Sequence, residues 1–84
     1  MGKKTVVWSP NVQAHVAAID QKTALGILHA IDEYLTTGAG DVKKLRPPRE
    51  DLRLRAGDYR VFFRPLGPRA IEILAIKHRK DAYR

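Results

Sequence analysis

The chain has 84 residues, a length typical of one domain, and we expect residues 1–84 to form a single domain. It has no cysteine, which excludes a disulfide framework, a thiolate zinc site and a cysteine nucleophile, and no apolar run approaches the roughly 18 residues of a membrane-spanning helix. The net charge of +7 is concentrated in residues 43–84, where 13 Lys and Arg residues accompany five acidic ones, and this indicates a polyanionic partner or, alternatively, a solubilising surface.

The first 20 residues predict a strand and a short helix. Residues 4–8 have the Val and Trp content of a strand, and no apolar region of a signal peptide precedes them, so we expect a cytoplasmic protein. Ser9 and Pro10 are typical of the start of a helix, as its N-cap and first helical residue. The apolar residues that follow recur at helical spacing: Val12, Val16 and Ile19. His15 lies beside this stripe, and we interpret it as a residue at the edge of the core rather than a ligand or base.

A second, longer helix is predicted to follow, with Asp20 or Thr23 as its N-cap. Its apolar stripe has five members: Ala24, Ile27, Leu28, Ile31 and Leu35. Gly26 costs this helix about 1 kcal/mol relative to alanine, and we expect it to mark a close approach to the first helix. Gly38 is a natural residue to end the helix. Because so few residues separate the two helices, we expect them to pack as an antiparallel hairpin.

The second half of the chain predicts strands. Residues 41–46 are expected to form a brief edge segment, and Pro47 and Pro48 then force an extended loop, because proline cannot donate to a strand ladder. Residues 52–56 alternate leucine with arginine, and residues 59–64 are rich in aromatic and β-branched side chains, so the two segments predict a hairpin. One face of this hairpin carries the arginines: Arg53, Arg55, Arg60 and Arg64. Four unpaired guanidinium groups cannot all be buried, so this face must be open to solvent or to an anion.

The last predicted strand is residues 70–76, which are apolar at nearly every position and indicate a central strand buried on both faces. Residues 77–84 form a basic tail. The predicted order is strand, helix, helix and three strands. This order indicates an α+β fold in which an N-terminal helical hairpin packs on one face of an antiparallel sheet. The helices require the leucine face of the sheet, so the arginine face is left uncovered.

The sequence contains few of the motifs that mark known catalytic, phosphate-binding or metal sites. There is no phosphate-binding glycine loop and no Ser/His/Asp arrangement, and the three dispersed histidines lack the spacing of a metal site, so we expect neither a metal nor a cofactor. What remains is a set of cations with one tyrosine: Arg53, Arg60, His78, Arg79 and Tyr83. Such a set suits a phosphodiester, because cations hold the phosphate and stabilise the added charge of a pentavalent transition state, while an aromatic ring stacks on a base.

Two segments together resemble the RelE/ParE superfamily of type II toxins. Leu52–Arg64 contains arginine-leucine-arginine followed by glycine-aspartate-tyrosine-arginine, and Ile76–Arg84 contains histidine-arginine-lysine-aspartate ahead of a tyrosine. The Ser9–Pro10 helix start and Val42–Leu45 also fit, so the resemblance covers essentially the whole chain. It implies a RelE-like fold and a small cytoplasmic toxin that a cognate antitoxin neutralises. In the RelE-like branch, the toxin enters the ribosomal A site and cleaves mRNA, with the 2′-hydroxyl as nucleophile and without a metal.

The resemblance also implies roles for individual residues. Arg53 corresponds to a basic residue of the catalytic strand and Arg60 to the arginine that binds the phosphate. Arg79 matches the arginine that assists the leaving group or the transition state, and Tyr83 matches the tyrosine that stacks on the substrate base. Four further cations are expected to bind substrate: Lys43, Lys44, Arg55 and Arg64.

One position departs from the family pattern. Some RelE members have a lysine base two residues before the position of Arg53, whereas this chain has Asp51, with Glu50 beside it. Related toxins use a glutamate base, so either carboxylate is a candidate if arginines keep it ionised, and the alternative is an ordinary loop carboxylate. His78 is a second candidate acid or base, and its alternative is a structural role at the end of the strand.

The departure leaves other functions open. A ParE-like toxin would inhibit DNA gyrase without catalysis, and a degenerate toxin would retain only antitoxin binding. In each case the expected partner is an antitoxin, in a hetero-oligomer, with an acidic or amphipathic segment that adds along the sheet edge or lies over the basic face. The ribonuclease interpretation adds the ribosome and mRNA as partners, and none of the three involves a membrane.

Overall fold

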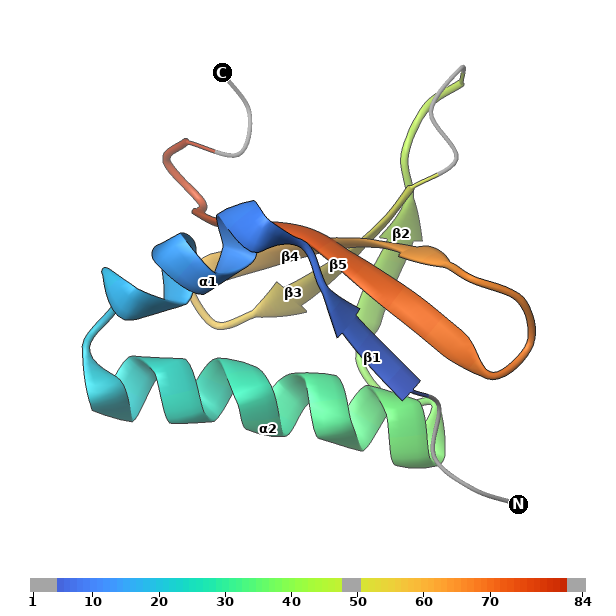
Figure 1. Ribbon diagram of the computed structural model, residues 1–84, viewed down its shortest axis with the longest axis horizontal. Coiled ribbons are helices and arrows are strands. Elements are labelled where there is room, and N and C mark those ends of the chain that lie inside the picture. Colours follow the sequence, from blue (N-terminus) through green and yellow to red (C-terminus); the bar gives the residue numbers. More distant parts are fainter. Residues whose placement is uncertain (1–4, 48–50, 82–84) are drawn as a thin grey trace.

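The computed structural model describes residues 5–47 and 51–81, and these form two helices and one five-stranded sheet (Figure 1). In chain order the elements are β1 (Thr5–Trp8), α1 (Pro10–Ala17), α2 (Gln21–Thr37), β2 (Asp41–Lys44), β3 (Leu52–Ala56), β4 (Tyr59–Pro65) and β5 (Ala70–His78). The strand order across the sheet is β1-β5-β4-β3-β2. The predicted α+β class is confirmed, and the segment expected at the edge is the edge strand β2. No helix in the described part of the chain is long and apolar enough to cross a bilayer.

One pairing departs from the predicted antiparallel sheet. Strands β2 to β5 are antiparallel to their neighbours, but β1 runs parallel to β5, with Val6 opposite Ile71 and Trp8 opposite Ile73. Short loops oblige successive strands to alternate in direction, whereas a connection through helices allows parallel pairing. Along the chain, the two helices lie between β1 and all the other strands, so no hairpin constrains the direction of β1 in the sheet.

The hydrophobic core lies between the helices and one face of the sheet. Its buried members come from both helices and from three central strands: Val12, Ile27, Ile31, Leu54, Val61, Phe63, Ile71, Ile73 and Ile76. Alternation along β3 and β4 places Leu54 opposite Val61, as the hairpin pattern predicts. The opposite face of the sheet carries the arginines, and no helix of the described chain covers it (Figure 1). We call it the open face.

The helix ends form as their sequences predict. Pro10 is the first residue of α1, and the Asp20 side chain caps α2 by accepting a hydrogen bond from the Thr23 N–H (3.0 Å). Hydrogen bonding from the Thr23 side chain, and then from this N–H, favours the ionised carboxylate and lowers the pKa of Asp20 below its ordinary value. Gly38 ends α2 in the left-handed conformation, with φ of 78°. The expectation for Gly26 was wrong: a Cβ there would meet nothing within 4 Å, so no close approach to α1 explains this glycine.

His15 connects α1 to the free edge of β5. Strand β1 pairs with β5 only as far as Ile73, and beyond that point α1 takes its place beside β5. The Ile76 N–H donates to Nδ1 of His15 (3.3 Å), so the imidazole satisfies a backbone group that a longer β1 would have bound. This agrees with the interpretation of His15 as a residue at the edge of the core.

Candidate functional site: a cation-rich sheet face at the β3–β4 turn

In the described chain, the open face carries a group of five cations on four adjacent strands around the β3–β4 hairpin. The register places Lys43 opposite Arg53, Arg55 opposite Arg60, and Arg60 opposite Lys77. We refer to these five residues as the open-face cations. Neighbouring strands lie about 4.8 Å apart, so Arg55, Arg60 and Lys77 form a row about 10 Å wide. Like charges that face each other across strands destabilise a sheet, and Asp41, opposite Arg55, is the acidic residue at the end of this row. The open face is therefore suited to an anion.

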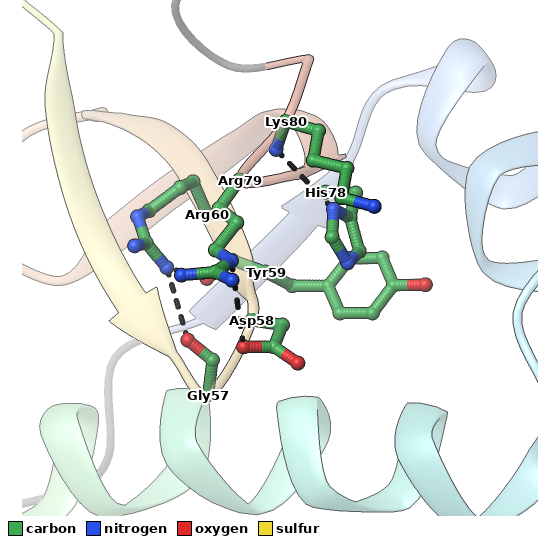
Figure 2. A network of polar contacts seen from close by, with 7 residues as sticks. All are labelled: Gly57, Asp58, Tyr59, Arg60, His78, Arg79 and Lys80. Carbon is green, nitrogen blue, oxygen red and sulfur yellow. Dashed lines mark hydrogen bonds and ion pairs between the residues drawn. The ribbon is translucent and has the colours of Figure 1, made fainter.

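The β3–β4 turn brings together Arg60, from β4, and Arg79, which directly follows β5 (Figure 2). Gly57 and Asp58 form a two-residue turn in which Gly57 has φ of 62°, as the first position of a type II′ turn requires. One guanidinium nitrogen of Arg60 donates to the carbonyl of Gly57 (3.0 Å), and the Arg79 N–H donates to the carbonyl of Asp58 (2.7 Å). Both arginines are thus attached to the same turn.

Arg60 is the buried cation of this face, with 8% of its surface exposed. Its NH1 nitrogen donates to the carbonyls of Gly57 and Tyr59, both at 3.0 Å. These carbonyls fix the plane of the guanidinium, but they carry no formal charge to offset its own. Within the described residues no carboxylate pairs with Arg60. A buried charge that no carboxylate of these residues compensates is costly, and a bound anion would reduce that cost.

Arg79 differs from Arg60 in its exposure. Its side chain is 60% exposed, and its Nε lies 3.8 Å from a carboxylate oxygen of Asp58, which is itself 71% exposed. An ion pair this long and this exposed contributes little to stability. The main chain of Arg79 is therefore anchored to the turn, while its guanidinium is held only weakly and is able to move toward an anion.

His78 has a defined tautomer when it is neutral. Its Nδ1 accepts a hydrogen bond from the Lys80 N–H (3.2 Å), so the proton of the neutral ring is on Nε2. The ring packs edge-on against Tyr59, with centroids 5.2 Å apart and planes at 83° (Figure 2). In this state Nε2 is a hydrogen-bond donor, so it can bind a phosphate oxygen but cannot accept a proton as a general base.

Several predicted site residues do not belong to the open-face cations. Arg64 is bound to Glu72, with both Nε and NH2 at 2.7 Å from the same carboxylate oxygen, so its charge is compensated. Lys44 is opposite Leu52, which alternation places on the helix side of the sheet. Asp51 directly precedes β3, and its carbonyl accepts from the Leu45 N–H (3.1 Å). Two further predicted site residues, Tyr83 and Glu50, lie outside the described residues.

Sequence reasoning missed two residues of this site, Lys77 and Asp58. Lys77 follows the buried Ile76, so alternation along the strand could have placed it on the arginine face, but we assigned it to a tail. Asp58 was recognised only as a turn residue, and nothing in the local sequence indicates its position beside Arg79. Within residues 5–47 and 51–81, no group of three or more His, Asp or Glu side chains could hold a metal ion.

Comparison with known proteins gives a family and a fold. The family model described as ParE toxin of type II toxin–antitoxin system, parDE, matches residues 6–83. Among solved structures, the RelE–RelB complex of Pyrococcus horikoshii has a chain that superposes with a TM-score of 0.75 at 24% identity, covering 96% of this chain and 100% of that one. The toxin–antitoxin complex RelBE2 of Mycobacterium tuberculosis gives 0.77 at 18% identity, with 92% and 99% covered. The comparison with curated proteins yields no significant match.

A third solved structure represents the toxin without its partner. A doubly substituted Escherichia coli RelE in the free state gives a TM-score of 0.71 at 12% identity, covering 98% of this chain and 90% of that one. At identities this low, the three structures support the fold and not the details of a site. The predicted RelE-like architecture is confirmed by them.

Proposed function

This chain belongs to the ParE toxin family of type II toxin–antitoxin systems, within the RelE/ParE superfamily, and we propose that it is a ribosome-dependent endoribonuclease that cleaves mRNA in the cytoplasm. The observation that carries the proposal is the attachment of Arg60 and Arg79 to one turn at the end of the row of open-face cations. A single-stranded RNA would lie across this row, with its scissile phosphate at the turn.

The chemistry proposed is attack by the 2′-hydroxyl on the adjacent phosphate. The oxygen–phosphorus bond to the 2′-oxygen forms as the bond to the 5′-oxygen of the next nucleotide breaks, through a transition state with additional negative charge. Arg60, buried and fixed by two carbonyls, is preorganised to hold the phosphate. Arg79, with its exposed guanidinium, would stabilise the charge that develops on the leaving oxygen. Arg53 and Tyr83 keep the roles that the family resemblance implies, as expectations.

Proton transfer requires an acid and a base. We propose His78 as the acid in its imidazolium form, which gives its Nε2 proton to the leaving 5′-oxygen and becomes neutral. In that form Nδ1 also carries a proton, so the hydrogen bond from the Lys80 N–H is released. The base that removes the 2′-hydroxyl proton is then a carboxylate, for which Asp51 and Glu50 are the candidates. A pH profile of cleavage by Asp51→Asn and His78→Gln would separate the two roles, because loss of the base removes the acidic limb of the profile and loss of the acid removes the basic limb.

An antitoxin is the partner that we propose for the resting state. The RelE chains of Pyrococcus horikoshii and Mycobacterium tuberculosis occur in complexes with antitoxins. Here the open-face cations offer an acidic segment the charge complementarity that would compensate Arg60, and β2 is an edge strand to which an extended segment could add. The resulting hetero-oligomer would block the RNA surface.

The test is to induce the chain and to map transcript ends in translating cells, with Arg79→Ala and Arg69→Ala as a matched pair. Both residues are exposed arginines, but Arg69 directly precedes β5, at the end of that strand away from the turn. Arg79→Ala should lower cleavage at least tenfold, while Arg69→Ala cleaves like the wild type. Intact transcripts in wild-type cells, or equal effects of the two variants, would remove the ribonuclease proposal.

The ParE family match favours a second candidate, inhibition of DNA gyrase without RNA cleavage. A supercoiling assay with purified gyrase distinguishes the two, because only a gyrase inhibitor stops supercoiling while leaving mRNA uncut. A chain that causes neither effect, yet still binds its antitoxin, would be a degenerate toxin.

A further inference from the structure

A cleft of about 570 Å³ lies on the helix side of the β3–β4 turn. One wall is formed by α2 between Thr23 and Ala30, with Gly26 and Ile27. The other wall is the end of the hairpin from residue 55 to residue 59, together with His78. Its volume lies within the range of small-ligand sites, about 300–1,000 Å³. None of the roles assigned above to Arg60 and Arg79 uses this space.

The cleft and the cations share one turn. Gly57 and Asp58 line the cleft, and the same two residues bind Arg60 and Arg79. Figure 2 shows the turn above α2, with Arg60 and Arg79 toward one side of it and the rings of Tyr59 and His78 toward the other. A ligand that places an anionic group on the arginines therefore has the mouth of the cleft within reach of its next group.

The lining favours a flat, polar ring. Tyr59 and His78 form an aromatic wall, and the Asp58 carboxylate and the Thr23 hydroxyl provide polar groups that could bind the edge of a base. Aromatic side chains beside a cationic track are the general means by which proteins hold the bases of single-stranded nucleic acid. An acidic protein segment would use the cations but would have no need of this combination.

Gly26 lines the cleft and has no side chain to fill it. It lies in the middle of α2, where glycine is an unfavourable residue, and a Cβ at this position would meet nothing within 4 Å. Packing inside the chain therefore does not account for the glycine, whereas the volume left for a ligand would. Resting on the proposed function, we infer that this cleft binds one nucleobase of the RNA, next to the phosphate held by Arg60 and Arg79.

The test fills the cleft without touching the arginines. The Gly26→Ala and Gly26→Leu variants are compared with His29→Leu, which adds an apolar side chain to an exposed position of the same helix outside the cleft. Binding of a short fluorescent single-stranded RNA is measured by anisotropy, together with mRNA cleavage on ribosomes. Loss of one stacked base corresponds to about 5- to 150-fold in affinity, so Gly26→Leu should bind at least fivefold more weakly, Gly26→Ala should be intermediate, and His29→Leu unchanged.

A second measurement identifies the occupant. RNAs with a single abasic nucleotide at each position in turn should include one position at which the loss of the base weakens wild-type binding as much as Gly26→Leu does. At that position the two changes should not add, because both remove the same contact. Thermal unfolding serves as the folding control, since leucine is the better helix former and Gly26→Leu should not lower the melting temperature.

The outcomes separate this inference from the proposed function. If the wild-type chain neither binds nor cleaves RNA, the proposed function fails and the inference fails with it. If the wild type is active and Gly26→Leu is equally active, only the base-binding cleft is overturned. If Gly26→Leu loses antitoxin binding and retains RNA binding, the cleft holds a protein segment and the inference is also overturned.

Discussion

His15→Ala should destabilise the chain although His15 is neither in the core nor in the candidate site. The imidazole Nδ1 accepts the hydrogen bond of the Ile76 N–H at 3.3 Å, and Ile76 is only 4% exposed. Removal of the acceptor leaves a backbone donor in a position that water reaches poorly. An unsatisfied buried donor costs about 1–3 kcal/mol. Because the 3.3 Å bond is long, we expect the lower part of that range, about 1–2 kcal/mol.

The measurement is thermal or urea unfolding of wild type, His15→Ala and His15→Asn. In a domain of 60–100 residues, 1 kcal/mol shifts the melting temperature by about 4–8 °C, so His15→Ala should melt roughly 5–15 °C lower. Asparagine places an amide oxygen near the position of Nδ1, so His15→Asn should recover most of the loss. Hydrogen exchange gives a local measurement, because the Ile76 amide should lose protection in His15→Ala. Equal melting temperatures for wild type and His15→Ala, with Ile76 equally protected, would refute the role of His15 at the free edge of β5.

Three further outcomes are expected. Because the pKa of Asp20 is lowered, its carboxylate stabilises the fold above the pKa of the unfolded chain, and this contribution is lost as pH falls through the lowered folded-state pKa. Urea unfolding of the wild type between pH 7 and pH 2 should show this loss of stability, and an identical pH dependence in Asp20→Asn would contradict the role of the carboxylate. Gly57→Ala forces alanine to a φ of 62° and should cost about 1–2 kcal/mol in unfolding free energy, whereas an unchanged value would mean that the turn relaxes at no cost. The logarithm of the RNA association constant should fall with the logarithm of the salt concentration, with a slope no steeper than about −4. This limit counts about 0.7 for each phosphate neutralised by one of the five open-face cations or Arg79, and a flat dependence would exclude this face as the contact.

Sequence periodicity predicted most of the fold because it reports local geometry. The alternation of leucine and arginine in β3 predicted both faces of the sheet, and Leu54 and Arg53 lie on opposite sides as expected. The sequence also predicted the two ends of α2, because Asp20 and Gly38 form hydrogen bonds with residues only a few positions away. The direction of β1 was not predicted, because a helical connection permits either orientation.

The charge balance of individual arginines required tertiary structure. Arg55 and Arg64 look alike in sequence, yet the register brings Glu72 to Arg64 and leaves Arg55 between Asp41 and Arg60. Arg60 was expected on an open surface, but it is largely buried, with its guanidinium bound to carbonyls of the turn. A salt bridge between strands depends on which residues the sheet places opposite each other, and composition does not contain that information.

By itself, the sequence determined the class of fold, the family and the side of the sheet that bears positive charge, because these follow from periodicity and from short motifs along the chain. The tertiary structure alone decided which cations meet at one turn, which are neutralised, and that a cleft opens between α2 and that turn. The physical reason is that electrostatic and steric effects act over a few ångströms in space, whatever the separation of the residues along the chain.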